Sequence, residues 1–222
     1  MVNKELKLIT KIHNSTKRNY LHRMVNSKIK CMLEAKKYEK NYWDGPRKFG
    51  YGGYRYIPGR LMPVAKKLIK KFKLNNKSII LDVGCGKGYL LYEIKRILPE
   101  IHICGFDRSR YAIKNAHKEI KKDLFVHLAE KKYPFSKKKF DLALGMGCFH
   151  NLEINDLKFA LSEIQRVSKK SYVMVESYRN EKELFNLQCW ALTCESFFSK
   201  AEWKWIFKQF KFKNYYEFIY FS

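Results

Sequence analysis

The stretch that decides the fold is Ser78-Ile79-Ile80-Leu81-Asp82-Val83-Gly84-Cys85-Gly86-Lys87-Gly88, which continues into Tyr89-Leu90-Leu91. The apolar run up to Val83 predicts a short buried strand, and the glycines that follow predict a tight turn. A helix is expected next, because apolar residues recur at helical spacing: Leu90, Leu91, Ile94, Ile97 and Leu98. Pro99 ends this pattern. The sequence therefore predicts a strand–turn–helix unit.

A second short strand follows, from Ile101 to Phe106, and it closes on the acid Asp107. Glycines in the preceding turn let the backbone approach a ligand closely. The start of the helix offers free N–H groups and the positive end of its dipole. An acid about 20 residues after such a turn can bind both hydroxyls of a ribose. The unit is therefore predicted to hold a nucleoside.

The spacing of the glycines separates two classes of nucleoside cofactor. A dinucleotide site requires G-x-G-x-x-G, but the sixth position counted from Gly84 is Tyr89. The pattern present is D-x-G-x-G-x-G, and the carboxylate of Asp82 suits a cationic ligand better than a pyrophosphate. With Asp107 and the later strands, residues 79–176 resemble the class I S-adenosylmethionine-dependent methyltransferases. A structural turn in another α/β domain is the alternative.

This resemblance implies S-adenosylmethionine as cofactor, S-adenosylhomocysteine as product, and no metal. The turn would cradle the amino-acid half of the cofactor, and the acid after the second strand would clasp the ribose. The predicted cofactor-binding residues are Asp82, Gly84, Cys85, Gly86, Gly88, Asp107, Arg108, Leu128, Ala129 and Met146. At the adenine end the family's usual acid is replaced by Leu128. Either Glu130 substitutes for it, or the adenine amine bonds to backbone and the ring rests on Leu128.

The order of elements predicts an α/β fold with a doubly wound, Rossmann-like, mostly parallel sheet of six or seven strands. Further strands are expected at residues 124–128, 140–145, 171–176 and 215–221, with a helix over 181–198 and a capping box at Ser199 and Glu202. We expect residues 1–60 to form an N-terminal helical and aromatic-loop extension, and residues 61–222 to form the methyltransferase domain.

Residues 41–60 are rich in glycine, proline and aromatic side chains, so they predict an irregular loop. Beside a cofactor site, such a loop is a candidate lid, with tyrosine faces near a sulfonium. Tyr54 and Arg60 are candidate substrate-binding residues, and Arg55 or Arg60 is a candidate partner of the cofactor's methionine carboxylate. A loop that only packs on the sheet edge is an equal alternative.

The loops after the fourth and fifth strands should face the transferred methyl group, because ligands bind at the carboxyl ends of such strands. His150 is the first candidate for a catalytic base and Glu176 the second. A role for His150 in orienting the loop together with Asn151 is equally open. Tyr178 and Arg179 are candidates for binding the acceptor, and a solvated loop arginine is the alternative for Arg179.

The acceptor is predicted to be a small polar, aromatic or sugar-type molecule, methylated on O or N. Base-amino methyltransferases of this fold carry an Asp/Asn-Pro-Pro-Tyr/Phe motif after the fourth strand, whereas this chain has residues 145–150 there, without proline. An RNA-modifying methyltransferase that uses a basic surface is the first alternative. A non-catalytic regulatory subunit that binds the cofactor is the second.

The chain has 46 Lys and Arg against 21 Asp and Glu, a formal net charge of +25. That charge permits attraction to nucleic acid. Lysines are spread along the whole chain and asparagine, isoleucine and tyrosine are abundant, so a compositional origin is favoured. No apolar run approaches the ~20 residues of a membrane helix, and no signal peptide is evident. We therefore expect a cytoplasmic protein, and the sequence leaves its oligomeric state open.

Overall fold

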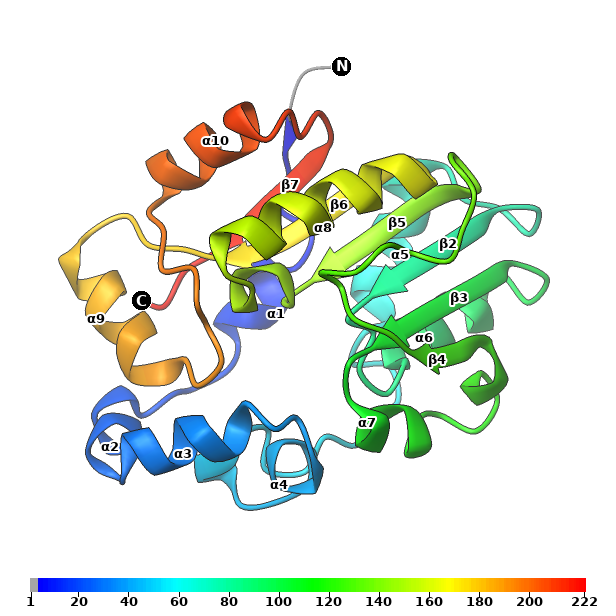
Figure 1. Cartoon of the computed structure of the whole chain (residues 1–222). Coiled ribbons are helices and arrows are strands. Elements are labelled where there is room, and N and C mark those ends of the chain that lie inside the picture. The colour runs from blue at the N-terminus through cyan, green and yellow to red at the C-terminus, as the bar shows by residue number, and fades with distance from the viewer. Residues whose placement is uncertain (1–3) are drawn as a thin grey trace.

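Seven parallel strands form the sheet at the centre of the computed structural model, which describes residues 4–222 (Figure 1). They are β1 (Lys4–Glu5), β2 (Ile79–Val83), β3 (His102–Asp107), β4 (Leu124–Val126), β5 (Phe140–Met146), β6 (Ser168–Glu176) and β7 (Tyr215–Ile219). The sheet order is β1-β7-β6-β5-β2-β3-β4, and every pairing is parallel. The predicted α/β, doubly wound fold is therefore confirmed, with seven strands.

The order in which successive strands are added to the sheet reverses between β2 and β5, although all the strands are parallel. From β2 the strands run outward through β3 to β4, and from β5 they run the other way through β6 to β7. In such sheets the strand order leaves a crevice at the carboxyl ends beside this switch point. Val83 of β2 pairs with Gly145 of β5, so the glycine turn and the loop after β5 emerge side by side.

Helices cover both faces of the sheet (Figure 1). On one face α8 (Ile154–Val167) and α10 (Lys200–Gln209) bury Leu161, Trp203 and Phe207. On the other, α5 (Met62–Phe72) and α6 (Tyr89–Ile97) bury Leu68 and Leu91. These apolar stripes recur every three to four residues, which is why each helix presents one continuous face to the sheet. The remaining helices are α1 (Thr10–Asn14), α2 (Tyr20–Val25), α3 (Lys28–Ala35), α4 (Lys40–Trp43), α7 (Arg110–Lys114) and α9 (Glu181–Trp190), with short 3₁₀ turns η1 (Arg47–Phe49), η2 (Lys121–Asp123) and η3 (Phe149–Asn151).

The N-terminal segment is joined to the edge of the sheet through β1, which pairs with β7. The buried carboxylate of Glu217 then accepts hydrogen bonds from the backbone N–H groups of Leu8, Ile9 and Thr10. From there the chain crosses to the carboxyl edge, where α2, α3 and α4 form a separate layer (Figure 1). Part of the predicted extension therefore belongs to the sheet, and the boundary at residue 60 stays a prediction.

One expected helix ends earlier than the sequence indicates. The capping box at Ser199 and Glu202 is present and begins α10 as predicted. The helix expected over 181–198 stops at Trp190, where Lys28 Nζ donates to the carbonyls of Cys189 and Ala191. A cation at these carbonyls satisfies acceptors that a continuing helix would use. No helix in the described residues is long and apolar enough to cross a membrane.

Candidate functional site

The glycine turn after β2 is held by backbone hydrogen bonds to the neighbouring strand. The N–H groups of Gly84 and Cys85 both donate to the Phe106 carbonyl, at 2.8 Å and 3.0 Å. Gly84 has a φ of +73°, and a Cβ there would lie 2.6 Å from Cys148 Cβ. Only glycine allows the two loops to approach this closely without strain. The third glycine, Gly88, stands at the N-terminal end of α6.

The Asp107 carboxylate ties this turn to the end of β3. One oxygen accepts from the Gly86 N–H and the other from the Ser109 N–H, both at 2.8 Å. Burial raises the pKa of Asp107, and these two hydrogen bonds oppose that shift. The carboxylate is fixed in orientation, and each oxygen keeps a lone pair for a ligand.

Asp82 lies deeper, at the end of β2, and is 4% exposed. Burial, reinforced by nearby Asp107, raises the pKa of this carboxyl to about 8. Its Oδ1 atom is buried and has no hydrogen-bond partner among residues 4–222. A buried acceptor without a partner is costly. A cationic or N–H-bearing ligand in the crevice would satisfy it.

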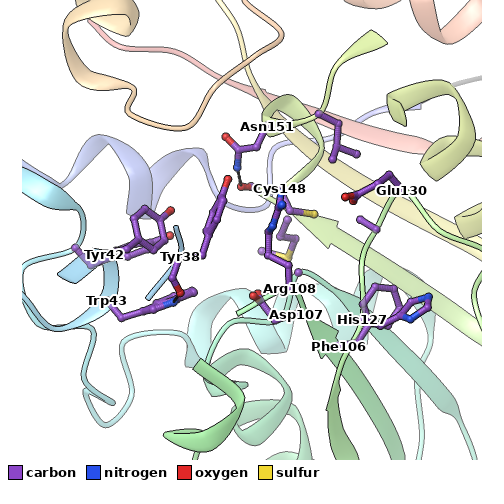
Figure 2. Close-up of a pocket in the computed structure, with 16 residues that line it drawn as sticks. Tyr38, Tyr42, Trp43, Phe106, Asp107, Arg108, His127, Glu130, Cys148 and Asn151 are labelled. Atoms are coloured by element: carbon purple, nitrogen blue, oxygen red, sulfur yellow. Dashed lines mark hydrogen bonds between the residues drawn. The ribbon is translucent and has the colours of Figure 1, made fainter. Parts of the chain in front are cut away.

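A pocket of about 600 Å³ opens beside the turn, and we call it the turn pocket. Figure 2 shows its walls: Tyr38 and Tyr42 on the side of the N-terminal layer, Asp107 and Arg108 on the sheet side, and Glu130 opposite. The lining residues are Tyr38, Tyr42, Trp43, Tyr51, Gly84, Phe106, Asp107, Arg108, His127, Ala129, Glu130, Met146, Gly147, Cys148, Asn151 and Leu152.

Five of the predicted cofactor-binding residues line this pocket directly: Gly84, Asp107, Arg108, Ala129 and Met146. The others, apart from Leu128, belong to the strand end and turn beside it. Leu128 is not among the lining residues, whereas both its neighbours His127 and Ala129 are. His127 was missed by the sequence reasoning, although its place just after β4 puts it at the carboxyl edge. Its ring meets Phe106 edge-on at 5.2 Å.

The aromatic segment of residues 38–54 lies over the glycine turn. The Trp43 ring would be 3.1 Å from a Cβ on Gly86, and its Nε1 donates to Ser109 Oγ at 2.8 Å. The Tyr54 ring stacks on Tyr89 at 5.1 Å. The structure thus places this segment beside the site, and its role as a moving lid stays a prediction.

A buried ion pair fastens this segment to the turn, and the sequence reasoning did not foresee it. Lys87, within the glycine motif, has a side chain that is 5% exposed and lies 2.7 Å from the Asp44 carboxylate. Asp44 also accepts from the Tyr111 hydroxyl and the Tyr54 N–H, at 2.9 Å and 3.1 Å. Three segments of the chain therefore meet at one carboxylate: the aromatic segment, the glycine turn and α7.

A second pocket, of about 860 Å³, adjoins the first, and we call it the arginine pocket. It is lined by Thr16, Arg18, Arg23, Tyr42, Arg47, Gly50, Tyr51, Arg60, Gly147, His150, Asn151, Glu176, Trp190, Ala191, Leu192 and Thr193. Tyr42, Tyr51, Gly147 and Asn151 line both pockets. Of the predicted substrate-binding residues, Arg60 lies here.

The two candidate catalytic residues, His150 and Glu176, face each other in the arginine pocket. His150 Nδ1 accepts from the Glu176 N–H at 3.3 Å, so the neutral ring carries its proton on Nε2. Nε2 lies 3.5 Å from Glu176 Oε2. Burial lowers the pKa of His150, and Glu176 only partly opposes this, so the ring is neutral at pH 7. In this arrangement the free basic atoms belong to Glu176.

The other three predicted substrate-binding residues do not line the arginine pocket. Tyr54 packs over the glycine turn and lines a separate outer pocket. Tyr178 forms a bridge with Ser199 at the start of α10. Arg179 forms a bidentate ion pair with Glu183 and stacks over Tyr220. Within residues 4–222 no group of three or more His, Cys, Asp or Glu side chains is placed to hold a metal.

Comparison with known proteins supplies independent information on the family. A family model described as "Methyltransferase domain" matches residues 74–218. The chain is 26% identical over 145 residues to a malonyl-[acyl-carrier protein] O-methyltransferase of Hahella chejuensis, which covers 62% of this chain and 50% of the relative. The chain therefore spans about half the length of that curated relative.

Solved structures resemble the same region. A putative methyltransferase in complex with the Haloferax volcanii Trm112 activator has a TM-score of 0.54 at 23% identity, over 66% of this chain and 65% of that one. A SAM-dependent methyltransferase from Aquifex aeolicus has a TM-score of 0.50 at 22% identity, over 70% and 83%. At these identities the structures support the fold, and the family model covers well over half of the chain. This chain therefore belongs to the class I, Rossmann-like S-adenosylmethionine-dependent methyltransferases.

Proposed function

We propose that the turn pocket holds S-adenosylmethionine and that the arginine pocket holds a small acceptor, which the enzyme methylates on O or N. One observation carries the proposal: the two pockets share Tyr42, Tyr51, Gly147 and Asn151 as a common wall. A donor and an acceptor in adjoining pockets can meet at that wall, as an in-line transfer requires.

The residues of the turn pocket fit this cofactor. When bound, S-adenosylmethionine supplies an electrophilic methyl group on a sulfonium. Asp107 is oriented to accept hydrogen bonds from two ribose hydroxyls. The unpartnered Oδ1 of Asp82 suits the ammonium of the amino-acid half. His127, Ala129 and Glu130 would surround the adenine.

The shared wall is aromatic on one side. Tyr42 and Tyr51 have ring centroids 5.3 Å apart and border both pockets. Aromatic faces attract a cation within about 6 Å, and their bulk excludes water from the reacting atoms. These two tyrosines are therefore proposed to position the sulfonium end.

Glu176 is proposed as the base for an acceptor that must lose a proton. Because His150 Nδ1 is engaged by a backbone N–H, the imidazole would orient the Glu176 carboxylate through Nε2. The sequence analysis placed His150 first and Glu176 second as the catalytic base, and we now propose the reverse order. Both residues remain part of the site, with Glu176 in contact with the acceptor and His150 as a positioning residue.

The curated relative is named for O-methylation of a malonyl group on acyl-carrier protein. We therefore propose O-methylation as the favoured chemistry for this chain. Because the match covers only half of the relative, we do not extend its acyl-carrier protein substrate to this chain. The basic composition keeps RNA as the second candidate. RNA binding whose affinity falls linearly with the logarithm of salt concentration would favour it.

Calorimetry with S-adenosylhomocysteine tests the proposal. The wild-type chain should bind one equivalent, and Asp107→Asn should weaken binding by roughly 10- to 100-fold, the value of one or two charged hydrogen bonds. Asp141→Asn is the matched control, because Asp141 accepts a backbone N–H from Ile79 at the opposite end of the sheet. Unchanged affinity in Asp107→Asn would reject the assignment of the ribose site.

A further inference from the structure

The arginine pocket has a strong excess of positive charge. Four of its lining side chains are guanidinium groups, those of Arg18, Arg23, Arg47 and Arg60, and its one acidic lining residue is Glu176. No carboxylate within residues 4–222 lies within 4 Å of any of the four arginines. Arg18 and Arg23 are half-buried, whereas Arg47 and Arg60 are exposed. Buried cations are usually paired with an anion, so the two inner arginines lack the counter-charge that their burial calls for.

One aromatic ring organises three of these arginines. The guanidinium carbons of Arg18, Arg23 and Arg47 lie 5.4 Å, 4.4 Å and 4.9 Å from the centroid of Trp190. Stacking on an aromatic face holds a guanidinium without using its N–H donors. Three like charges around one ring also repel one another, and a bound anion would relieve that repulsion.

Several donors of the cluster remain open. Arg18 and Arg23 donate to backbone carbonyls through their Nη atoms, whereas their Nε atoms are buried and have no hydrogen-bond partner among the described residues. Arg47 donates to the Gly50 carbonyl through Nη1 alone. Burial first, and Arg47 second, lower the pKa of Arg23 to about 10, so it stays charged at neutral pH. Charged donors fixed by a scaffold match the oxygens of carboxylates and phosphates.

The basic lining continues outward from this pocket. An adjoining pocket is lined by Lys17, Arg18, Asn19, His22, Arg23, Asn26, Arg47, Lys48 and Trp190, with no acidic residue. Its basic residues come from the N-terminal segment and η1, and it shares three arginines with the arginine pocket. A cleft of one sign focuses the field and attracts ligands of the opposite sign.

We infer that the acceptor carries a carboxylate or phosphate group, which binds between the guanidinium groups of Arg18, Arg23, Arg47 and Arg60. This inference rests on the proposed function, because it identifies the arginine pocket as the acceptor site. It narrows the acceptor from any small polar molecule to a small anion. Arg47 and Arg60 contact the anion from the exposed side, and Trp190 holds the inner arginines in place.

Calorimetry tests this with the full chain saturated with S-adenosylhomocysteine, at constant ionic strength. Sodium phosphate and sodium malonate are the anionic probes, and malonamide is the neutral counterpart of malonate. One saturable site per chain is expected for an anion and none for malonamide. The probe that binds more tightly identifies phosphate or carboxylate as the group recognised.

Arg47→Gln and Arg60→Gln should each weaken anion binding about tenfold, the value of a charged hydrogen bond. Arg47→Lys and Arg60→Lys keep the charge and should recover part of the loss. Arg55→Gln is the matched control, because Arg55 belongs to the same exposed loop but does not line the arginine pocket. Its anion affinity should stay within twofold. Every variant should bind S-adenosylhomocysteine normally, because Arg47, Arg55 and Arg60 do not line the turn pocket, contrary to the expectation that Arg55 or Arg60 meets the cofactor's carboxylate.

Three results would overturn the inference while the proposed function stands: no saturable anion binding to a chain that binds S-adenosylhomocysteine, equal binding in all variants, or equal binding of malonamide. A fourth would be RNA binding that Arg47→Gln abolishes and that phosphate and malonate fail to compete with. Failure to bind S-adenosylhomocysteine at all would instead contradict the proposed function.

Discussion

The turn pocket and the arginine pocket share a wall but are built in opposite ways. The turn pocket depends on backbone geometry at the ends of neighbouring strands, and it has the carboxyl of Asp107 in its wall and that of Asp82 buried beside it. The arginine pocket depends on long side chains from α2, the segments beside it and α9, and its central groups are guanidiniums.

This difference suggests that the two pockets have separate roles, one in binding the cofactor and the other in binding the acceptor. A fixed backbone site with acidic groups suits a constant, cationic cofactor. A side-chain site on segments outside the sheet can change its chemistry without disturbing the fold, as acceptor sites do when one scaffold serves many reactions. The experiments below separate the two regions by asking which property each residue controls.

The largest expected effect lies at the Lys87–Asp44 pair, which fastens the aromatic segment of residues 38–54 to the glycine turn. Asp44→Asn leaves a nearly buried lysine without its counter-charge and should lower the free energy of unfolding by roughly 3 kcal/mol. Urea denaturation measures this. Glu195→Gln is the control, because the exposed Lys36–Glu195 pair should contribute less than about 1 kcal/mol. Equal losses would mean that the buried pair does not hold the aromatic segment.

The same pair predicts a pH dependence. Burial alone would raise the pKa of Asp44, but hydrogen bonds from Lys87 and Tyr111 outweigh it and lower the pKa below 3.8. A lowered native pKa stabilises the fold above the usual value, and this stabilisation is lost as pH falls through the native value. The stability difference between wild type and Asp44→Asn should therefore be full at pH 7 and shrink below about pH 4. A constant difference down to pH 3 would contradict this.

The next largest effect is on turnover and is expected from a substitution in the arginine pocket. Glu176→Gln should lower turnover about 100-fold if Glu176 removes the acceptor's proton, and it should leave affinity for S-adenosylhomocysteine within twofold. Transfer of tritium from methyl-labelled S-adenosylmethionine into the low-mass fraction of a cell extract measures turnover. Glu181→Gln, at an exposed position in α9, is the control. Normal turnover in Glu176→Gln would remove this residue as the base.

A smaller effect is expected from two glycine substitutions, which together distinguish side-chain crowding in the turn pocket from backbone strain. Gly84→Ala should cost roughly 1–3 kcal/mol of stability and weaken S-adenosylhomocysteine binding, because the new methyl would meet Cys148. Gly59→Ala is matched, with a φ of +75° but nothing within 4 Å of the added Cβ. It should show the strain of a positive φ alone, about 1 kcal/mol. Equal behaviour of the two variants would argue against the close approach of the loops.

The smallest effect concerns Arg179. Its side chain is 52% exposed, but its partner Glu183 is only 4% exposed. Arg179→Gln should therefore cost roughly 1–2 kcal/mol, because Glu183 keeps the Arg179 backbone N–H as a donor, and it should leave turnover unchanged. The tritium-transfer assay and urea denaturation check both parts. A large loss of turnover with normal stability would instead support the role in acceptor binding that the sequence analysis suggested for Arg179.

The turn pocket could be predicted from the sequence because its parts are local. One motif and one acid 20 residues later specify Gly84, Asp82 and Asp107, and the strand order specifies where they meet. His127 was missed because its neighbour Leu128 was aligned with the family's usual acid, whereas the strand ends two residues earlier. A strand boundary is the feature that sequence patterns locate least well.

The arginine pocket could not be predicted, because it unites residues 16–60 with residues 147–193. No short-range pattern links Arg23 or Arg47 to Trp190; only the docking of α2 and η1 beside α9 brings them together. The strand β1 was missed for a similar reason. Two residues carry no periodicity, and they pair with Tyr215 and Tyr216 of β7, at the far end of the chain.

The most direct test of the proposed cofactor site is a crystal structure of the chain with S-adenosylhomocysteine. We expect the nucleoside in the turn pocket, both ribose hydroxyls within hydrogen-bond distance of Asp107, and the sulfur at the wall formed by Tyr42 and Tyr51. A ligand bound elsewhere, or a turn pocket filled by the chain's own side chains while the ligand binds in solution, would contradict it.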